Sequence, residues 1–252
     1  MTLHVEVSGS GPALLLIPGG AGDAATFGRL GPELCGERTI VAYDRRGFSR
    51  SGAPARERRF DVDVDDAARL IDLHGGGRAD VFGSSSGAIV ALGLAERFPG
   101  KVRRVVAHEP PLTVMVGDEA DLRAGFDDVV AVFRRSGAGA GMRRFGEVTG
   151  LGYREPPRAA LPPAVAEVLD RIAGNVPFWM EEELRQYTAI VPGPAAVDVV
   201  VAVGEAWEPF PARAARGLAA RLGTAAVVFP GGHDGYIERP AEFAARLLEV
   251  LT

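Results

Sequence analysis

A glycine- and serine-rich segment, Gly83–Gly87, is the part of this sequence best suited to chemistry. It reads Gly-Ser-Ser-Ser-Gly and matches the pattern Gly-x-Ser-x-Gly, in which the central serine, Ser85, stands on a tight turn between a strand and a helix. Glycines on either side suit a turn that brings the neighbouring backbone too close for a side chain. The chain has 33 glycines, so the segment alone fits a helix-capping loop equally well. Other residues must decide between these readings.

A serine hydroxyl needs a base before it can attack a carbonyl carbon near neutral pH. Among the four histidines, His233 is the best placed. It follows a predicted strand at 225–229 and a turn at 230–232, and it precedes the last helix. The glycines of that turn let the imidazole face the sheet edge where Ser85 is expected. We predict His233 as the general base, and the alternative is a histidine that caps a helix.

The base in turn needs a carboxylate that orients it. In most folds of this kind the acid follows the next-to-last strand, but Trp207 holds that position and cannot accept the imidazole proton. Glu205 and Glu208 lie nearby and are candidates. Glu109 is the preferred acid because it lies at the carboxyl end of the strand predicted at 102–107 and can reach the same imidazole from a neighbouring strand. The alternative for Glu109 is a charged strand-end residue ahead of two prolines.

Acyl transfer also requires N–H groups that bind the developing oxyanion. One is the backbone N–H of Ser86, which follows the nucleophile at a helix N-terminus. The second is expected in the loop after the strand predicted at 13–17, where glycines let the backbone approach a substrate. We select Gly20 in that loop, and a plain glycine turn is the alternative.

These residues can meet only if several strands end at one edge of a sheet. Short, continuous apolar runs alternate with helical patterns, which predicts an α/β fold with a doubly wound, mostly parallel sheet. Strands are expected at 3–7, 13–17, 39–43, around 81–82, and at 102–107, 197–203 and 225–229, with a turn at 8–12; helices are expected at 62–73, from 88 to about 99, and at 241–251.

The alternation stops at residues 112–194, where helical stripes of apolar residues replace strands. We expect this segment to form an inserted helical cap over the carboxyl ends of the strands, where ligands bind in α/β sheets. Residues 1–111 and 195–252 would then form the core, and the glycine-rich 137–141 a flexible connection. The stripes are Leu122, Phe126, Val129, Val130 and Phe133; Val165, Val168, Leu169 and Ile172; and Met180, Leu184 and Tyr187.

The order of these motifs resembles that of the α/β-hydrolase superfamily over essentially the whole chain. The resemblance rests on Pro18–Gly20, Tyr43–Ser51, Gly83–Gly87 and Gly232-His233. It implies the α/β-hydrolase fold and, for Tyr43–Ser51, a structural turn beside the active site with no chemical role.

The chain is further similar to the zearalenone-type lactone hydrolases. Those enzymes take their acid from the position of Glu109 and hold the lactone with a cap tryptophan at the position of Trp179, so the resemblance implies these roles here. Gly19 stands at a substrate-binding position where those lactonases commonly have an acidic residue, and much of 118–163 matches them poorly. The similar segments are 83–88, 108–110, 175–179 and 230–233.

The sequence therefore predicts a serine hydrolase, a carboxylic ester hydrolase or lactonase, that works through an acyl-enzyme. No metal or organic cofactor is implied, because no group of His, Cys and carboxylate residues has ligand spacing. Two alternatives stay open. The same triad would also suit a non-hydrolytic or carbon-carbon bond reaction in a biosynthetic pathway, and the fold would also suit a ligand-binding receptor with little turnover.

Composition and charge exclude some classes of binding partner. A net charge of -5 over 252 residues leaves no basic stripe for nucleic acid. No signal-peptide pattern occurs, and no apolar run approaches the roughly 20 residues that span a bilayer. We expect a cytoplasmic protein with a small-molecule ester or lactone substrate and with no nucleic-acid or membrane partner, and a homodimer is left open.

Overall fold

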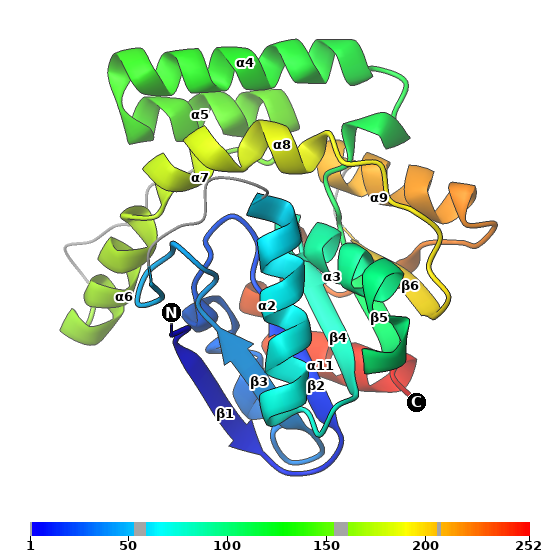
Figure 1. The fold of residues 1–252 in the computed structure, drawn as a ribbon. Coiled ribbons are helices and arrows are strands. Elements are labelled where there is room, and N and C mark those ends of the chain that lie inside the picture. Colours follow the sequence, from blue (N-terminus) through cyan, green and yellow to red (C-terminus); the bar gives the residue numbers. More distant parts are fainter. Residues whose placement is uncertain (1, 53–58, 154–160, 206–207) are drawn as a thin grey trace.

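The computed structural model describes residues 2–52, 59–153, 161–205 and 208–252. A seven-stranded sheet in the order β1-β3-β2-β4-β5-β6-β7 lies at its centre, with helices on both faces (Figure 1). β1 pairs antiparallel with β3, and the other pairings are parallel. The predicted doubly wound, mostly parallel sheet is confirmed. The strands are β1 Val5–Gly9, β2 Ala13–Ile17, β3 Thr39–Tyr43, β4 Ala79–Ser84, β5 Val102–His108, β6 Asp198–Gly204 and β7 Val227–Phe229.

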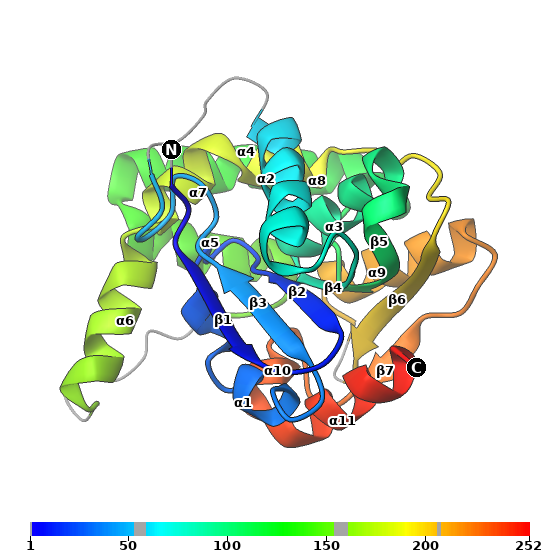
Figure 2. The same cartoon turned by 60° about the horizontal axis from the view of Figure 1, so that its bottom comes forward.

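The central and edge strands differ in burial. β2 and β4 are buried along their whole length, as expected of parallel strands covered on both faces. β1 lies at one edge (Figure 2), and four of its five residues are exposed. Its predicted bounds, 3–7, are wrong, because Ser8 and Gly9 belong to the strand and pair with Ile40 and Thr39. An exposed edge strand carries no apolar pattern that would mark its end.

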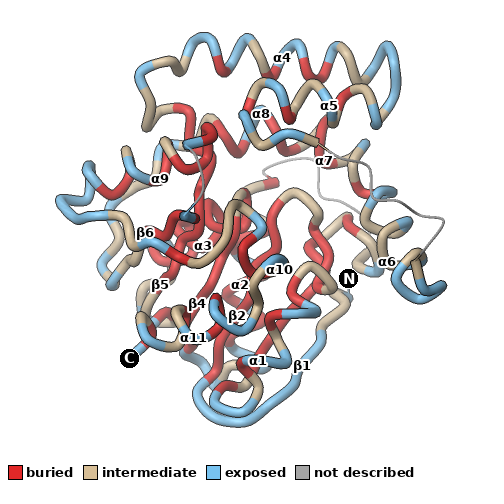
Figure 3. The backbone as a smooth tube through the Cα atoms, turned by 180° about the vertical axis from the view of Figure 1, so that it is seen from behind, coloured by how far each residue is buried: buried red, intermediate tan, exposed pale blue. Residues whose placement is uncertain are grey.

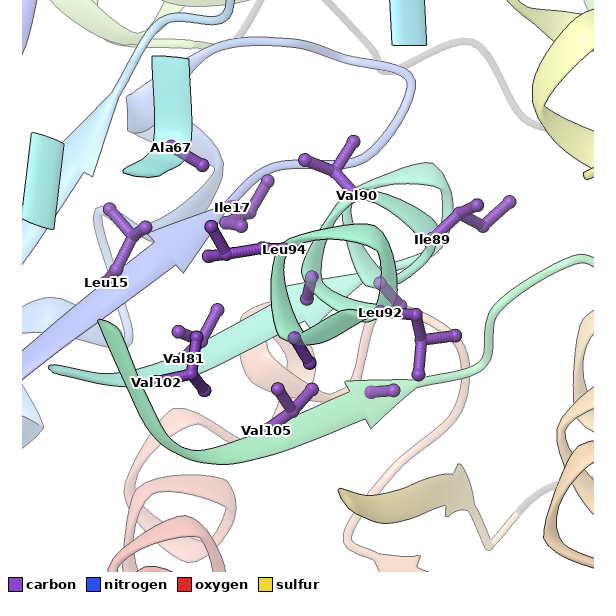
Figure 4. Close-up of a cluster of buried hydrophobic side chains, with 14 of the residues drawn as sticks. Leu15, Ile17, Ala67, Val81, Ile89, Val90, Leu92, Leu94, Val102 and Val105 are labelled. Atoms are coloured by element: carbon purple, nitrogen blue, oxygen red, sulfur yellow. The ribbon is translucent and has the colours of Figure 1, made fainter. Parts of the chain in front are cut away.

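Two apolar clusters join the helices to the two faces of the sheet. Leu15 and Ile17 of β2 belong to the cluster under α2, α3 and α9, while Leu14 and Leu16 belong to the one under α1 and α11. This division follows from the alternation of side chains along a strand. Figure 4 shows the first cluster, in which side chains of α3 lie among those of β2, β4 and β5. The helices around the sheet are η1 Ala24–Phe27, α1 Gly31–Leu34, α2 Arg59–His74, α3 Ser86–Arg97, η2 Pro99–Lys101, α9 Phe210–Arg221, α10 Gly235–Glu238 and α11 Pro240–Val250.

Between β5 and β6 the described residues form helices and no strand. We call α4–α8 the helical layer; in Figure 1, α4, α5, α7 and α8 lie across the top of the sheet and α6 descends at the left. Its inner side chains form a third apolar cluster with Phe210 of α9, whereas the outer side of α4 and most of α6 are exposed or half-buried (Figure 3). The helices of this segment are η3 Thr113–Met115, α4 Glu119–Ser136, α5 Ala138–Thr149, α6 Pro163–Ala173, α7 Val176–Glu182 and α8 Leu184–Thr188.

The glycine-rich segment 137–141 is not the flexible connection that the sequence predicts. Only Gly137, with φ 83°, separates α4 from α5, which begins at the next residue. Gly141 lies inside α5, and a Cβ there would be 2.8 Å from Phe133 Cβ and 2.9 Å from Met180 Sδ. The missing side chain lets α5 pack closely on α4 and α7. Sequence composition cannot distinguish this tertiary requirement from a flexible loop.

We expect substitutions two residues apart in α5 to change stability in opposite directions. Gly139→Ala should raise the free energy of unfolding by up to about 1 kcal/mol, because alanine favours the helix and its Cβ meets only Arg143 Nη1 at 3.6 Å. Gly141→Ala should lower it by about 1–3 kcal/mol, because its Cβ collides with Phe133. Urea denaturation measures both. Equal stabilisation by the two alanines would contradict the packing role of Gly141.

Candidate active site

Ser85 stands on the sharp turn between β4 and α3. Its φ of 56° and ψ of -125° are unusual for a residue with a side chain. A Cβ on Gly83 would lie 2.4 Å from the carbonyl oxygen of Gly87, and a Cβ on Gly87 would lie 2.2 Å from that of Ile17. Only glycine fits at both positions, because β2, β4 and α3 approach one another here. The turn therefore holds Ser85 at the carboxyl edge of the sheet.

Glu109 and His233 are hydrogen-bonded to each other at the same edge. Glu109 Oε2 lies 2.6 Å from His233 Nδ1, and the N–H of Gly204 on β6 donates to Oε1 over 2.9 Å. Because both carboxylate oxygens have a partner, the carboxylate holds the imidazole in one orientation. The φ of Glu109 is 47°, so Ser85 and Glu109 are two of only three non-glycine residues with positive φ in the described chain. Such strain concentrates at functional sites.

The contact shifts the pKa values of both groups. Burial alone would raise the pKa of Glu109, but its hydrogen bond to His233 and the charge on that ring lower it to about 2. Burial alone would lower the pKa of His233, but the hydrogen bond and charge of Glu109 raise it above its ordinary value. Glu109 is therefore ionised near neutral pH and stabilises the protonated form of the imidazole.

The other candidate acids have partners elsewhere. Glu205 is exposed and accepts a hydrogen bond from Arg239 Nη1 at 2.6 Å. Glu208 is also exposed and pairs with Arg216 Nε at 2.9 Å. Trp207, at the position where the acid is expected in most such folds, lies outside the described residues. Of the acids considered from the sequence, Glu109 is the one that the structure brings to the imidazole.

The loop after β2, Gly19–Asp23, passes directly beside Ser85. A Cβ on Gly19 would lie 2.9 Å from Ser85 Cβ, which leaves no room for the acidic side chain common at this position in the lactonases. A Cβ on Gly20 would lie 2.6 Å from Trp179 Nε1, so the indole of α7 covers this glycine. Both glycines are therefore required by close contacts, one with the turn at Ser85 and one with the helical layer.

Three side chains hold this loop at alternate residues, and two of them come from the helical layer. One of these bonds holds the carbonyl group of Gly19 in one direction. Because the peptide is trans, the N–H of the next residue, Gly20, points the opposite way, so its direction is fixed as well. Asn175, which the similarity to lactonases includes, thus acts here as an anchor of the loop. The bonds run from Arg45 Nη2 to Gly19 O at 2.9 Å, from Asn175 Nδ2 to Ala21 O at 2.7 Å and from Arg171 Nε to Asp23 Oδ2 at 2.7 Å.

Arg45 belongs to a buried group of charged side chains between the core and the helical layer. Its guanidinium contacts Glu183 at 2.6 Å and Asp63 at 2.9 Å, and Arg59 contacts Glu183 at 2.8 Å. Each side chain is at most 1% exposed, and two positive charges balance two negative ones. The sequence interpretation gave Tyr43–Ser51 no role beyond a turn. An arginine two residues after a buried strand was the signal that could have revealed this group.

Two cavities meet at Ser85. The larger, of about 890 Å³, is lined by Ser85, His233 and the start of the 19–23 loop, and by Leu169 and Ile172 of α6. The smaller, of about 20 Å³, is lined by Ser85 and Ser86, by mostly apolar side chains of the helical layer together with Glu183, and by Phe210 and Pro211 of α9. No residue of α6 is buried, so its predicted apolar stripe is not part of a core: Leu169 and Ile172 line the larger cavity, and Val165 is exposed. Among the described residues, the lining shared by both cavities is Ser85, Phe145, Leu151 and Trp179.

His108, the residue before Glu109, fills the space behind the site. Both ring nitrogens lack a hydrogen-bond partner, and burial lowers its pKa to about 4. Its ring centroid is 6.3 Å from that of His233 and 5.3 Å from that of Phe243. A neutral ring here adds no positive charge beside His233 near neutral pH.

Within the described ranges, no group of three or more His, Cys, Asp or Glu residues is arranged to hold a metal ion. None of the described helices combines the length and the apolar character needed to cross a membrane. The sheet edge carries a serine hydroxyl, an imidazole and a carboxylate.

Comparisons with known proteins identify the family. Residues 12–133 match the family described as the alpha/beta hydrolase fold. A hydrolase from Bacillus subtilis, YraK, is 35% identical to this chain, and the alignment covers 99% of this chain and 92% of YraK. The chain belongs to the α/β-hydrolase family.

Two other similar proteins extend this result. A zearalenone hydrolase from Cladophialophora bantiana is 28% identical, and the alignment covers 98% of this chain and 91% of that protein. The structure of an enol-lactonase from Burkholderia xenovorans LB400 superposes with a TM-score of 0.76 at 20% identity, covering 99% of this chain and 96% of that one. The superfamily resemblance and the similarity to zearalenone hydrolases are confirmed, while the enol-lactonase shows the fold alone.

We expect loss of the buried carboxylate at Glu183 to destabilise this α/β hydrolase strongly. Glu183→Gln leaves Arg45 and Arg59 with a single carboxylate, which should cost roughly 3–5 kcal/mol of unfolding free energy. Glu181→Gln is the matched control, since Glu181 forms an exposed pair with Arg134 and should cost no more than about 1 kcal/mol. Urea denaturation at neutral pH compares them. Similar small losses would mean that the buried group does not join the layer to the core.

Proposed function

We propose that this α/β hydrolase is a serine hydrolase that cleaves carboxylic esters or lactones through Ser85, His233 and Glu109. One observation carries the proposal: the 2.6 Å contact between Glu109 and His233 lies on the wall of the same cavity as Ser85. A nucleophile, a base and an acid that orients the base are the parts that acyl transfer requires. No hydrogen bond joins Ser85 Oγ to His233 among the described residues, and such bonds often tighten only when substrate binds.

In the first half of the reaction, Ser85 Oγ attacks the carbonyl carbon while His233 takes its proton. Glu109 stabilises the imidazolium that forms and keeps Nδ1 protonated, so that Nε2 is free to act as the base. The N–H groups of Gly20 and Ser86 donate to the oxyanion. The carbon-oxygen bond to the alcohol then breaks, and the alcohol leaves with the proton from His233.

In the second half, water replaces the alcohol. His233 removes a proton from water as the hydroxide attacks the acyl-enzyme, and the same proton returns to Ser85 Oγ when the acid leaves. The side chains and the backbone of this chain supply every proton transfer in the scheme, so it calls for no cofactor.

We further propose that residues 112–194 act as a cap over a core formed by 1–111 and 195–252. Trp179 supports this role because it lines both cavities and covers Gly20. A tryptophan offers a substrate a broad apolar face and one N–H donor. Gly19 would meet the substrate through its backbone.

Ser85→Ala should lower kcat for a simple aryl ester on the order of 10⁶-fold, because it removes the nucleophile. A fluorophosphonate probe should label the wild-type protein at Ser85 and should not label the variant. Circular dichroism controls for folding. Unchanged ester turnover by a folded Ser85→Ala protein would refute the proposed mechanism.

The pH dependence of kcat/KM tests Glu109. His233 must be neutral to act as the base, and its raised pKa places the loss of activity on acidification above the ordinary value of about 6.5. Glu109→Gln removes the main charge that raises this pKa while burial still lowers it, so the midpoint should move below that of the wild type. Activity should also fall about 10⁴-fold, as expected for an imidazole in the wrong tautomer.

Glu205→Gln is the matched control for that experiment, because Glu205 is exposed and bonds Arg239. Its pH profile and rate should equal those of the wild type. A larger effect at Glu205 than at Glu109 would assign the acid to the loop after β6.

A further inference from the structure

The two cavities at Ser85 are in contact with different parts of the catalytic machinery. Ser85 lines both of them. His233 lines the larger cavity, and so does Gly20, whereas the smaller cavity is bounded by Ser86 and the helical layer and not by the imidazole. A substrate whose carbonyl carbon lies at Ser85 therefore extends in two distinct directions.

The chemistry decides which half of an ester takes which direction. His233 must deliver a proton to the oxygen of the departing alcohol, so that oxygen has to lie on the imidazole side. The alcohol therefore occupies the larger cavity of about 890 Å³. The acyl substituent, which stays bonded to the carbonyl carbon on Ser85, is left with the smaller cavity.

The smaller cavity limits the length of that substituent. Its volume is about 20 Å³, against about 890 Å³ for the larger cavity. It therefore admits a much shorter chain than the larger cavity does.

The walls of this cavity are closely packed. Phe126 and Phe210 are each 1% exposed and their ring centroids lie 5.8 Å apart, and Phe126 also stacks on Phe145 at 6.3 Å. Leu184, which is 2% exposed, belongs to the same apolar cluster. A longer acyl chain would have to displace side chains that are already in contact on all sides.

We propose that this enzyme is selective for acetyl and similarly short acyl esters of large, predominantly apolar alcohols. The inference rests on the proposed serine-hydrolase function and adds the substrate class. Ser85 Oγ bonds the acetyl carbon, the bond from that carbon to the alcohol oxygen breaks, and His233 gives the alcohol its proton; water then releases acetic acid and restores Ser85. Leu169, Ile172 and Val176 give the larger cavity an apolar wall for the alcohol.

Esters of 2-naphthol with acyl chains of two, four, six and eight carbons test the proposal, because the leaving group stays constant. We expect kcat/KM to fall about 100-fold from acetate to hexanoate, the range that overpacking a rigid site produces. Phe126→Ala and Phe210→Ala enlarge the smaller cavity, and each should raise the hexanoate-to-acetate ratio about 10-fold or more. Phe133→Ala is the control, since Phe133 packs in the same cluster but lines neither cavity.

Equal kcat/KM values across the four chain lengths, or a ratio that neither cavity variant changes, would overturn the acyl-length inference while leaving the serine-hydrolase function intact. Faster hydrolysis of a macrolactone than of the acetate would also overturn it. Absence of turnover for every ester, together with no fluorophosphonate labelling of Ser85, would instead refute the proposed function itself. An unchanged ratio in Phe133→Ala, with altered ratios in the two cavity variants, would support the inference.

Discussion

The buried contact of Arg45 with Glu183 and Asp63 is the interaction on which the site depends most. It joins the core to the helical layer through buried side chains whose positive and negative charges balance. The same guanidinium donates a hydrogen bond to the carbonyl oxygen of Gly19. The backbone beside Ser85 is thus fixed by the group that attaches the layer. The stability of this interface and the direction of the Gly20 N–H therefore depend on the same interaction.

The sheet and the main features of the site follow from local sequence. Continuous apolar runs located β2 and β3 at their observed bounds, because parallel strands buried on both faces need such runs. The glycines around Ser85 could be interpreted from the sequence because the turn leaves no room for a Cβ atom at their positions. Glu109 could be selected because it directly follows a strand next to the turn, and the structure brings it to His233. Its catalytic role stays a prediction.

Features that depend on distant residues could not be predicted in the same way. Arg45 and Glu183 are 138 positions apart, and neither position suggests the other. Gly141 resembles a loop glycine in composition, although it is required by contact with Phe133 and Met180. The stripe of α6 has the pattern of a core helix, but none of its residues is buried, and Leu169 and Ile172 line a cavity. In each case tertiary contacts, which a single sequence does not display, determine the outcome.

The position of Glu109 directly after β5 has a consequence for how this enzyme can diversify. β6 supports the acid only through the backbone N–H of Gly204, and no side chain of the 205–209 connection contacts the imidazole among the described residues. In folds that carry the acid after β6, that connection must preserve a carboxylate. In the mechanism proposed above, the connection need not supply the carboxylate, and because Pro209 borders the larger cavity, insertions or exchanges in the connection can reshape substrate access. The enzyme thereby gains a second region for evolving specificity, independent of its helical layer.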